Sequence, residues 1–405
     1  MLRVLKFGGT SVGSLDKIKN VVQIIKKFKN LGDDIVAVVS AMGGETNKLI
    51  EYACTFSNTP NKAEMDMLLS SGERVTSALL SIALNEEGFK TISMSGADAG
   101  IITTSQHMNA RIETIDTSNM ENILSSGKII VVAGFQGVSV DSKVTTLGRG
   151  GSDLTAVAIA GALNADICEI YTDVDGIYTT DPRIEPKARK LVKISYDEML
   201  ELASLGAKVL QNRSVEMAKK LNVNLVSRSS FTPEVEGTLI THEGTKEDIM
   251  EAPIVSGIAL DKNQTRIGMY GLIDKPGIAS SIFTALANDD INVDMIVQTR
   301  GLNNTTNLDF TVSSDSIEKV KSIMLNFEED SQKIDYNSNI CKVSIVGVGM
   351  KSHTGVASKA FTSMAKDNIN INIISTSEIK ISIIIDEKYA ELAVRSLHNA
   401  YELEK

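Results

Sequence analysis

The stretch Lys6-Phe7-Gly8-Gly9-Thr10-Ser11-Val12 lies where a short apolar run, residues 2–7, gives way to a helical pattern. Adjacent glycines let backbone N–H groups approach an anion closely, the following helix adds its positive end, and Lys6 adds a full charge. A plain glycine turn with a helix N-cap at Thr10 or Ser11 has the same signature. The stretch therefore predicts a strand-to-helix turn that suits phosphate, and other motifs must decide between the two interpretations.

Apolar runs alternate with helical patterns from the N-terminus to about Ser229. The strand-like runs are residues 2–7, 35–40, 90–94, 128–133, 167–172 and 223–227. Between them, apolar residues recur three or four positions apart, as in amphipathic helices. This alternation predicts an α/β fold in which helices sandwich a largely parallel sheet.

Residues 277–296 repeat as residues 355–374 without a gap, and 10 of the 20 positions are identical. A strand pattern precedes each copy, at residues 264–272 and 342–348, and Ile-Asn followed by another strand pattern closes it. This order predicts βαββαβ units and resembles the ACT domain, a small amino-acid-sensing module that works in pairs. A purely structural ferredoxin-like repeat has the same pattern, but polar asparagines at equivalent strand starts favour a sensor.

Composition and charge exclude several classes of protein. The 405 residues carry a formal net charge of −10 and only 4% are aromatic, whereas a nucleic-acid surface needs a basic stripe and stacking side chains. No apolar run reaches bilayer length and no leader pattern is present, so we expect a cytoplasmic protein without membrane contact. Three scattered cysteines and four histidines form no zinc or hydrolase motif, so we expect no metal site built by the protein.

Three further motifs concentrate residues that packing alone does not explain. They are Ser70-Ser71-Gly72-Glu73-Arg74, which interrupts a helical pattern, Thr146-Leu147-Gly148-Arg149-Gly150-Gly151-Ser152-Asp153, which opens a helical pattern at residues 154–163, and Tyr171-Thr172-Asp173-Val174-Asp175-Gly176-Ile177-Tyr178, which leaves a strand at an acidic turn. Open α/β sheets bind ligands at the carboxyl ends of their strands, so a nucleotide at the acidic turn is consistent with this placement.

The glycine-rich loop at Arg149 suits an amino acid. An arginine fork grips a carboxylate through two parallel hydrogen bonds, and a carboxylate such as that of Asp153 suits an ammonium group. Glu73 either adds a second contact to the ammonium group or is a solvated helix charge paired with Arg74 or a nearby lysine. The chain has no GxxxxGK[ST] loop, no GxGxxG at the start of a βαβ unit and no protein-kinase catalytic loop. If the protein transfers phosphate, its fold therefore differs from those of P-loop ATPases and protein kinases.

In this order, and followed by two ACT-like units, the four motifs resemble the aspartokinase family over essentially the whole chain. The resemblance implies an amino-acid-kinase fold followed by two ferredoxin-like ACT domains. The implied boundaries are residues 1–240 for the catalytic domain, 241–262 for a linker with a possible shared strand, 263–336 for the first ACT domain and 337–405 for the second.

The resemblance also implies the reaction, which transfers the γ-phosphoryl group of MgATP to the side-chain carboxylate of L-aspartate. The product is 4-phospho-L-aspartate, on the way to lysine, threonine and methionine. The acceptor is already ionised at pH 7, so the catalytic task is to bring two anions together and stabilise the charge in flight, which calls for lysines rather than histidines. Mg²⁺ is expected to bind mainly through the nucleotide phosphates. Inhibition by lysine, threonine or both, and a homodimer or homotetramer assembled through the ACT-like units, are implied as well.

Individual roles are carried over motif by motif. The residues implied in catalysis are Lys6, Asp153 and Lys208. The residues implied in aspartate binding are Ser40, Thr46, Glu73, Arg149 and Ser152. The residues implied in nucleotide binding are Lys6, Gly8, Gly9, Thr172, Asp173, Tyr178, Asp181, Arg183, Lys208 and Val209. The residues implied in effector binding are Asp274, Gly277, Ala279, Asn292 and Gln298 in the first copy and Ser352, Gly355, Asn370, Asn372, Ser375 and Thr376 in the second. Around Thr46, the sequence Gly-Gly-Glu-Thr-Asn departs from the family's usual Gly-x-Thr-Thr-Asp.

Two other interpretations remain open from the sequence. Another amino-acid kinase of the same fold, acting on glutamate, acetylglutamate, a nucleoside monophosphate or carbamate, would share the phosphate motifs, although the Ser-Gly-Glu-Arg segment and the paired repeats argue against it. A non-catalytic amino-acid sensor would share the repeats, but it would have no need to keep Lys6, Arg149, Asp153, Asp173 and Lys208 together.

Overall fold

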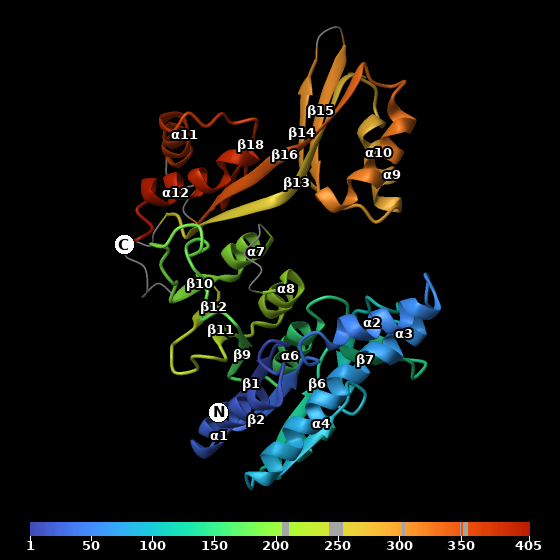
Figure 1. Cartoon of the computed structure of the whole chain (residues 1–405), viewed down its shortest axis with the longest axis vertical. Helices are drawn as coiled ribbons and strands as arrows, with labels where there is room; N and C mark the ends of the chain where they lie inside the picture. The colour runs from blue at the N-terminus through green and yellow to red at the C-terminus, as the bar shows by residue number, and fades with distance from the viewer. Residues whose placement is uncertain (205–209, 243–253, 302–303, 349, 351–354) are drawn as a thin grey trace. The chain divides into compact units, whose positions relative to one another are not determined.

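The computed structural model describes residues 1–204, 210–242, 254–301, 304–348, 350 and 355–405. Within these ranges the chain forms two compact units (Figure 1). The first contains Met1–Ile177, Lys190–Ser204 and residues 210–242, and the second contains Tyr178–Arg189 and the described residues from 254 onwards. No helix among the described residues is long and apolar enough to cross a membrane.

An eight-stranded sheet in the order β10-β12-β11-β9-β1-β2-β6-β3 forms the centre of the first unit. Its strands are β1 (Leu2–Phe7), β2 (Asp34–Val39), β3 (Thr91–Met94), β6 (Ile129–Ala133), β9 (Ile167–Thr172), β10 (Lys193–Ser195), β11 (Leu225–Ser229) and β12 (Thr238–Thr241). β11 and β12 pair antiparallel, and the other described pairings in this sheet are parallel. The predicted α/β fold with a largely parallel sheet is confirmed.

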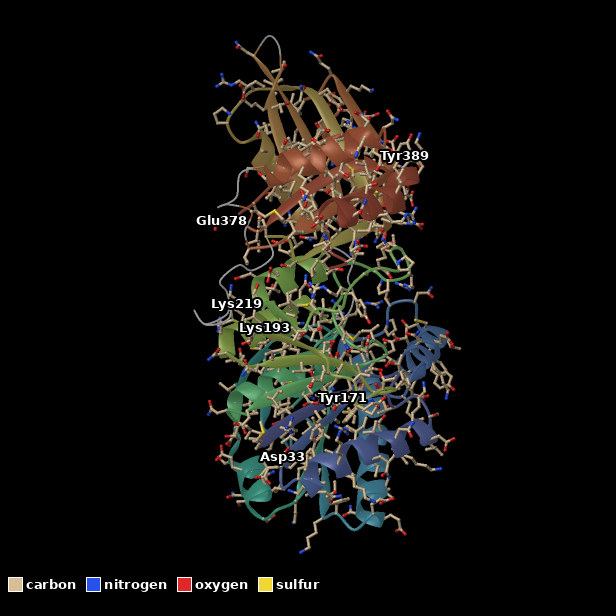
Figure 2. All side chains as sticks on the ribbon, turned by 90° about the vertical axis from the view of Figure 1, so that its left-hand side faces the viewer. Asp33, Tyr171, Lys193, Lys219, Glu378 and Tyr389 are labelled. Carbon is tan, nitrogen blue, oxygen red and sulfur yellow. The ribbon has the colours of Figure 1, made fainter. Side chains whose placement is uncertain are left out.

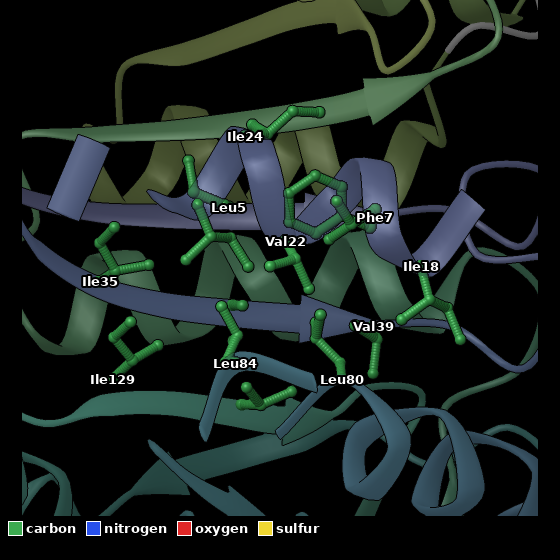
Figure 3. Packing of buried hydrophobic residues seen from close by; sticks show 14 of the residues in the cluster. Leu5, Phe7, Ile18, Val22, Ile24, Ile35, Val39, Leu80, Leu84 and Ile129 are labelled. Carbon is green, nitrogen blue, oxygen red and sulfur yellow. The ribbon is translucent and has the colours of Figure 1, made fainter. Parts of the chain in front are cut away.

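A large hydrophobic core lies between this sheet and helices α1 (Leu15–Asn30) and α4 (Ser71–Glu86) (Figure 3). Leu5 and Phe7 of β1 point into this core, and because side chains alternate along a strand, Lys6 points to the opposite face. That face is covered by α6 (Gly151–Ala162), on which α8 (Asn212–Leu221) packs. The N-cap of α1 is Ser14, so a cap at Thr10 or Ser11 is not the reason for the glycine turn.

Shorter elements complete the first unit. The helices are α2 (Glu45–Phe56), α3 (Lys62–Leu69), α5 (Ser118–Ser125) and α7 (Tyr196–Ser204). A small sheet in the order β5-β4-β7-β8 consists of β4 (Ile101–Thr103), β5 (Ile112–Ile115), β7 (Gln136–Ser139) and β8 (Val144–Thr146). The sequence analysis did not predict this sheet, because strands of three or four residues are too short for an alternating pattern to emerge.

An antiparallel sheet in the order β14-β15-β13-β16-β18-β17 forms the second unit. Its elements in chain order are β13 (Gly257–Ile273), α9 (Ile278–Asn288), β14 (Val293–Arg300), β15 (Thr305–Val312), η1 (Ser314–Ser316), α10 (Ile317–Met324), η2 (Leu325–Phe327), β16 (Lys333–Val346), α11 (Val356–Lys366), β17 (Ile373–Thr376), β18 (Lys380–Asp386), η3 (Glu387–Tyr389) and α12 (Ala390–Ala400). In Figure 1, α9 and α10 lie beside one end of the β13–β16 pair, and α11 and α12 lie beside the other.

The two repeats share their long strands. The second half of β13 begins the first repeat, and residues 257–261 at its start pair with residues 342–346 of β16 as the fourth strand of the second repeat. The implied boundary between the linker and the first repeat, at residues 262–263, therefore falls inside β13, and the implied boundary between the two repeats, at residues 336–337, falls inside β16. Gly277 and Gly355, at φ +99° and +98°, cap α9 and α11, so the repeated glycines occupy one left-handed conformation that other residues rarely adopt.

The segment Tyr178–Arg189 belongs to the second unit, although its sequence lies within the implied catalytic domain. Its Thr179 carbonyl accepts a hydrogen bond from the Ile258 amide at 2.7 Å, and its Thr179 hydroxyl lies 3.0 Å from Nε2 of His398 on α12. Ile184 packs against the same core as α11 and α12. A short excursion between β9 and β10 is thus part of the unit that carries the repeats.

Candidate active site

The carboxyl ends of four neighbouring parallel strands meet at one edge of the large sheet. Phe7 of β1 is in register with Val39 of β2 and Tyr171 of β9, and Val39 is in register with Ala133 of β6. The segments that follow these strands carry Gly8, Ser40, Gly134 and Asp173, so motifs far apart in the sequence are gathered along this edge.

Lys6 and Asp153 form a nearly buried ion pair at this edge. The Lys6 Nζ lies 2.6 Å from Oδ1 of Asp153, and the two side chains are 9% and 11% exposed. The contact is a close charge pair rather than an aligned hydrogen bond, since Oδ1 has no partner with hydrogen-bond geometry. Asp153 lies in the first turn of α6, where the helix dipole also favours a carboxylate. The pair links the end of β1 to the loop that contains Arg149.

The Gly8-Gly9 turn leaves little room for side chains. A Cβ on Gly8 would lie 3.2 Å from the Lys6 Nζ, and one on Gly9 would lie 3.1 Å from the Ala41 carbonyl oxygen. The Gly8 amide donates to the carbonyl of Tyr171, which is buried in the first unit (Figure 2), and the amides of Ser11 and Val12 return to the Gly8 carbonyl. The Gly8 amide is therefore used by the fold, whereas the Gly9 amide has no hydrogen-bond partner among the described residues.

Glu73 presents a buried carboxylate with one free oxygen. Its Oε1 accepts a hydrogen bond from the Ala41 amide at 3.0 Å, while Oε2 has no partner among the described residues. The residue is 4% exposed, and burial raises the pKa of its carboxyl to about 7, partly opposed by the hydrogen bond from Ala41. The interpretation of Glu73 as a solvated charge paired with Arg74 or a lysine is wrong, because Glu73 is buried and has no ion pair among the described residues, and Arg74 donates instead to Gln136 at 3.4 Å.

The break in the helix before Glu73 has a steric reason. α3 ends at Leu69 and α4 begins at Ser71, which places Glu73 in the first turn of α4. A Cβ on Gly72 would lie 2.8 Å from the Ala41 Cβ, so only glycine lets α4 approach the end of β2 this closely. The Ser-Gly-Glu-Arg motif therefore brings a carboxylate to the end of β2.

Arg149 lies exposed between two glycines in left-handed conformations, Gly148 at φ +78° and Gly150 at φ +69°. The loop is anchored at its start, where the Thr146 hydroxyl donates to Oδ1 of the buried Asp66 at 2.5 Å. Ser152 is buried beyond the loop and packs on Gly134, where a Cβ would lie 2.9 Å from the Ser152 Cβ. No ion pair of Arg149 occurs within the described part of the chain, so its guanidinium is available to a ligand.

The other implied aspartate contacts lie on the segment after β2. The Ser40 amide donates to the Phe7 carbonyl at 3.1 Å, which leaves the Ser40 side chain half-buried at the sheet edge. Thr46 lies in the first turn of α2, whose N-cap is Gly44 at φ +86°. Ser40 thus lies directly at the site edge, and Thr46 follows on the adjoining helix.

The implied nucleotide residues are divided between the two units. Thr172 ends β9 and Asp173 follows it in the first unit, and the Thr172 hydroxyl accepts from the Val174 amide at 3.1 Å. Tyr178, Asp181 and Arg183 belong to the second unit, where Arg183 and Asp181 form an ion pair at 2.7 Å. Hydrogen bonds from Arg183 lower the pKa of the Asp181 carboxyl. Lys208 and Val209 lie outside the described residues.

A hydroxyl pair that the sequence analysis did not select joins three strand ends. The Ser11 and Ser230 Oγ atoms lie 2.8 Å apart, and both residues are buried. The Ser230 amide donates to the Thr172 carbonyl at 3.0 Å, so β11, β9 and the glycine turn are tied together. Ser230 has no local sequence signal, because the contact forms across 219 positions of the chain.

The implied effector residues lie mostly on the surface of the second unit. Those that are exposed are Asp274, Gly277, Asn292, Gln298, Gly355, Asn370, Asn372 and Thr376, while Ala279 and Ser375 are half-buried. Ser352 lies outside the described residues. Gln298 donates to the Thr306 hydroxyl at 3.1 Å, and Asn372 donates to Asp386 at 3.3 Å. Gly355 also lines a cavity of about 980 Å³ bounded by α11, α12 and the segment around Lys187.

Residues 1–226 match the amino acid kinase family, and residues 269–324 and 343–401 match the ACT domain. The chain is 60% identical to an aspartokinase of Helicobacter pylori strain J99 over the full length of both chains. It is 51% identical to an aspartokinase of Pseudomonas aeruginosa, covering 100% of this chain and 98% of that one.

Solved structures match over the whole chain as well. Aspartokinase III of E. coli in complex with lysine and aspartate superposes with a TM-score of 0.77 at 25% identity, covering 98% of this chain and 99% of that chain. The same enzyme in complex with aspartate and ADP gives a TM-score of 0.81 at 24% identity, covering 99% of both chains, which supports the fold.

Proposed function

Because this chain belongs to the aspartokinase family and is therefore an aspartate kinase with ACT domains, we propose that it transfers the γ-phosphoryl group of MgATP to the side-chain carboxylate of L-aspartate. The product would be 4-phospho-L-aspartate, which leads towards lysine, threonine and methionine. One observation carries the proposal. The Lys6–Asp153 pair, the free oxygen of Glu73 and the loop of Arg149 all lie near the carboxyl ends of the strands, at one edge of the large sheet.

Two charged side chains would bind the backbone groups of the amino acid. The guanidinium of Arg149 suits the α-carboxylate, since its planar fork can donate two parallel hydrogen bonds. The free Oε2 of Glu73 suits the ammonium group, because a positive ligand would supply the partner that this buried carboxylate lacks. Ser40, Thr46 and Ser152 would offer hydroxyls around the remaining polar atoms. Glutamate would be rejected by its extra methylene group, which displaces the acceptor carboxylate from the phosphoryl group.

Lys6 would stabilise the charge of the phosphoryl group during transfer. Aspartate needs no general base, because its side-chain carboxylate is ionised at pH 7. The obstacle is repulsion between two anions, and a preorganised ammonium group at the meeting point lowers it. Asp153 would hold this ammonium in place and balance its charge before the substrates bind. Lys208 would supply a second positive charge.

The nucleotide would bind at Gly8, Gly9, Thr172, Asp173, Tyr178, Asp181, Arg183 and Val209 together with the two lysines. The unpartnered Gly9 amide fits a phosphate oxygen. Mg²⁺ would be held mainly through the phosphates, since no group of three or more His, Cys, Asp or Glu side chains gathers as a metal site in the described ranges. When bound, the ion would neutralise phosphate charge.

The repeats would bind lysine, threonine or both and inhibit the enzyme. The match to the ACT domain supports a sensing role, and the E. coli enzyme was solved with lysine as well as aspartate. The exposed Asn292 and Asn370, at equivalent positions before β14 and β17, would hold polar ends of an effector. A homodimer or homotetramer assembled through the repeats would complete these sites.

Initial rates of ADP formation test the proposal. Aspartate should support turnover, whereas glutamate, acetylglutamate, a nucleoside monophosphate and carbamate should not, and lysine or threonine should lower the rate with aspartate. Turnover with another acceptor but not with aspartate would refute the substrate assignment. Full activity in the presence of both amino acids would refute the proposed inhibition.

A further inference from the structure

The loop around Arg149 is held from α8 by a second arginine. Arg213, the second residue of α8, donates from Nη1 to the Leu147 carbonyl at 2.6 Å and from Nη2 to the Ala110 carbonyl at 3.1 Å. Nη1 also lies 3.2 Å from Oδ1 of Asn109. One guanidinium therefore joins the residue two positions before Arg149 to the segment at 109–110.

The first turn of α8 also contacts the loop on the other side of Arg149. A Cβ on Gly150 would lie 1.9 Å from Cγ of Gln211, so the backbone at Gly150 rests directly against the N-cap residue of α8. Met217, one turn after Arg213, packs against a buried cluster that contains Leu147. The start of α8 thus touches the chain two residues before Arg149, at Leu147, and directly after it, at Gly150, while the Arg149 side chain itself stays exposed.

A guanidinium is well suited to this position. Its planar fork reaches two carbonyls in fixed directions, which the single ammonium group of a lysine cannot reproduce. Burial and the nearby charge of Arg111 lower the pKa of Arg213, opposed by Glu216, but an arginine stays protonated. The carbonyl groups that Arg213 binds belong to the backbone. Its hydrogen bonds therefore fix the position of the loop and leave the charge on the Arg149 side chain unchanged.

We propose that Arg213 is a positioning residue for the kinase reaction, which fixes the Gly148-Arg149-Gly150 turn so that the Arg149 guanidinium meets the amino-acid substrate at one place. The inference rests on the proposed role of Arg149. A fixed turn spares the loss of loop freedom when the amino acid binds, so Arg213 acts on aspartate affinity. It has no described contact with the glycine turn or with the segment after β9, so the nucleotide side stays unaffected.

Steady-state kinetics of Arg213→Lys and Arg213→Gln test this role. In Arg213→Gln the aspartate KM should rise about tenfold, which corresponds to about 1.4 kcal/mol, while the ATP KM stays within about twofold. Arg213→Lys should recover only part of the loss, because one ammonium group replaces a fork. Arg111→Gln is the matched control: it removes a positive charge from the same neighbourhood, while the described hydrogen bonds of that residue are made by its backbone amide and carbonyl. Its aspartate KM should stay at the parent value.

A double-mutant cycle separates positioning from general support of the fold. If Arg213 acts through Arg149, the aspartate KM of the double variant Arg149→Lys with Arg213→Gln should be nearly the same as that of Arg149→Lys alone. A lowered melting temperature with both KM values unchanged, or with both raised equally, would overturn the proposal and leave Arg213 as a structural tie. If the Arg213 variants do not fold, Asn109→Ala removes one exposed acceptor and should raise the aspartate KM about threefold, and an unchanged KM would count against the proposal.

These outcomes separate the inference from the proposed function. No aspartate-dependent ADP formation by the parent protein would refute the function itself. An unchanged aspartate KM in Arg149→Lys would refute the role of Arg149, and with it the inference. An effect in Arg149→Lys without an effect in the Arg213 variants would refute the inference alone.

Discussion

The Nζ of Lys6 lies 2.6 Å from Oδ1 of Asp153, which joins the carboxyl end of β1 to the first turn of α6. Both side chains are nearly buried, so neither charge is screened well by water. A positive charge held this firmly at the carboxyl ends of the strands can act on an anion without rearranging. The following predictions start from this pair and extend to its neighbours.

Lys6→Ala should lower kcat by at least about 100-fold, the scale of losing one preorganised charge. It should also lower the melting temperature, because the buried Asp153 carboxylate loses its partner. Adding Asp153→Asn to Lys6→Ala should recover melting temperature without recovering kcat. Activity of the single variant within tenfold of the parent would remove Lys6 from the mechanism.

The aspartate KM should rise as pH falls below about 7, because Glu73 must be ionised to hold an ammonium group and burial raises its pKa to about 7. The substrate carboxylates stay ionised above pH 5, so they do not produce this change. The expected slope approaches about tenfold in KM per pH unit below the pKa. Glu73→Gln should have a high aspartate KM that no longer depends on pH between 5.5 and 8. A pH profile unchanged by Glu73→Gln would contradict the assignment.

Stability gives an independent check on the same carboxyl. Its pKa in the folded state is raised from 4.5 to about 7, so the folded state binds the proton more tightly than the unfolded state. The stability that this group contributes is full at low pH and is lost as pH rises towards 7. The melting temperature of Glu73→Gln minus that of the parent should therefore be larger at pH 8 than at pH 5. An equal difference at both pH values would count against the raised pKa of Glu73.

Arg149→Lys should raise the aspartate KM by roughly tenfold or more, because an ammonium group cannot donate two parallel hydrogen bonds to one carboxylate. The ATP KM should stay within about twofold. The melting temperature should be unchanged, since the side chain is exposed. Lys143→Gln, which removes an exposed positive charge from the turn between β7 and β8, is the control. Because Arg149→Lys keeps the positive charge, an aspartate KM that is unchanged in Arg149→Lys, or raised equally in Lys143→Gln, would contradict a specific contact of the Arg149 fork.

Asn292→Ala, Asn370→Ala or Thr376→Ala should shift the inhibitory concentration of lysine or threonine by roughly tenfold or more, while kcat and the aspartate KM without effector stay within about twofold. These side chains are exposed, so stability should not change. Asn288→Ala, at the exposed last residue of α9, should leave inhibition as in the parent. Calorimetry that detects no amino-acid binding to the parent protein, with aspartate absent, would contradict a sensing role.

Much of the fold could be predicted because its signals are local. The parallel strands of the first unit are continuous apolar runs, and the helices between them carry an apolar period, so the α/β fold follows from short stretches of sequence. The repeat shows itself by identity alone, and its glycines at residues 277 and 355 share one conformation. The sequence missed β4, β5, β7, β8, β10 and β12 and the full length of β13 and β16, because pairing with distant strands decides where such strands begin and end.

The candidate site divides in the same way. Glycines and charges at strand ends single out Lys6, Glu73, Arg149 and Asp153 from the sequence, because those positions need unusual backbone conformations or carry charge next to apolar runs. Whether Glu73 was solvated or buried could not be predicted, since the answer depends on how closely α4 approaches the end of β2. Arg213 and Ser230 carry no local signal, and only their contacts with residues far away in the chain reveal them.

By itself, the sequence determined the alternation of the main parallel strands with helices, the internal repeat and the residues with chemical capacity at the strand ends, because these depend on the periodicity and residue types of neighbouring positions. Only the tertiary structure decided which charges are buried, which are paired and which stay free: the Lys6–Asp153 pair, the unpartnered oxygen of Glu73 and the hold of Arg213 on the Leu147 carbonyl. Burial and pairing are set by atoms that approach through space, so they exist only once the sheet has brought the ends of β1, β2, β6 and β9 together.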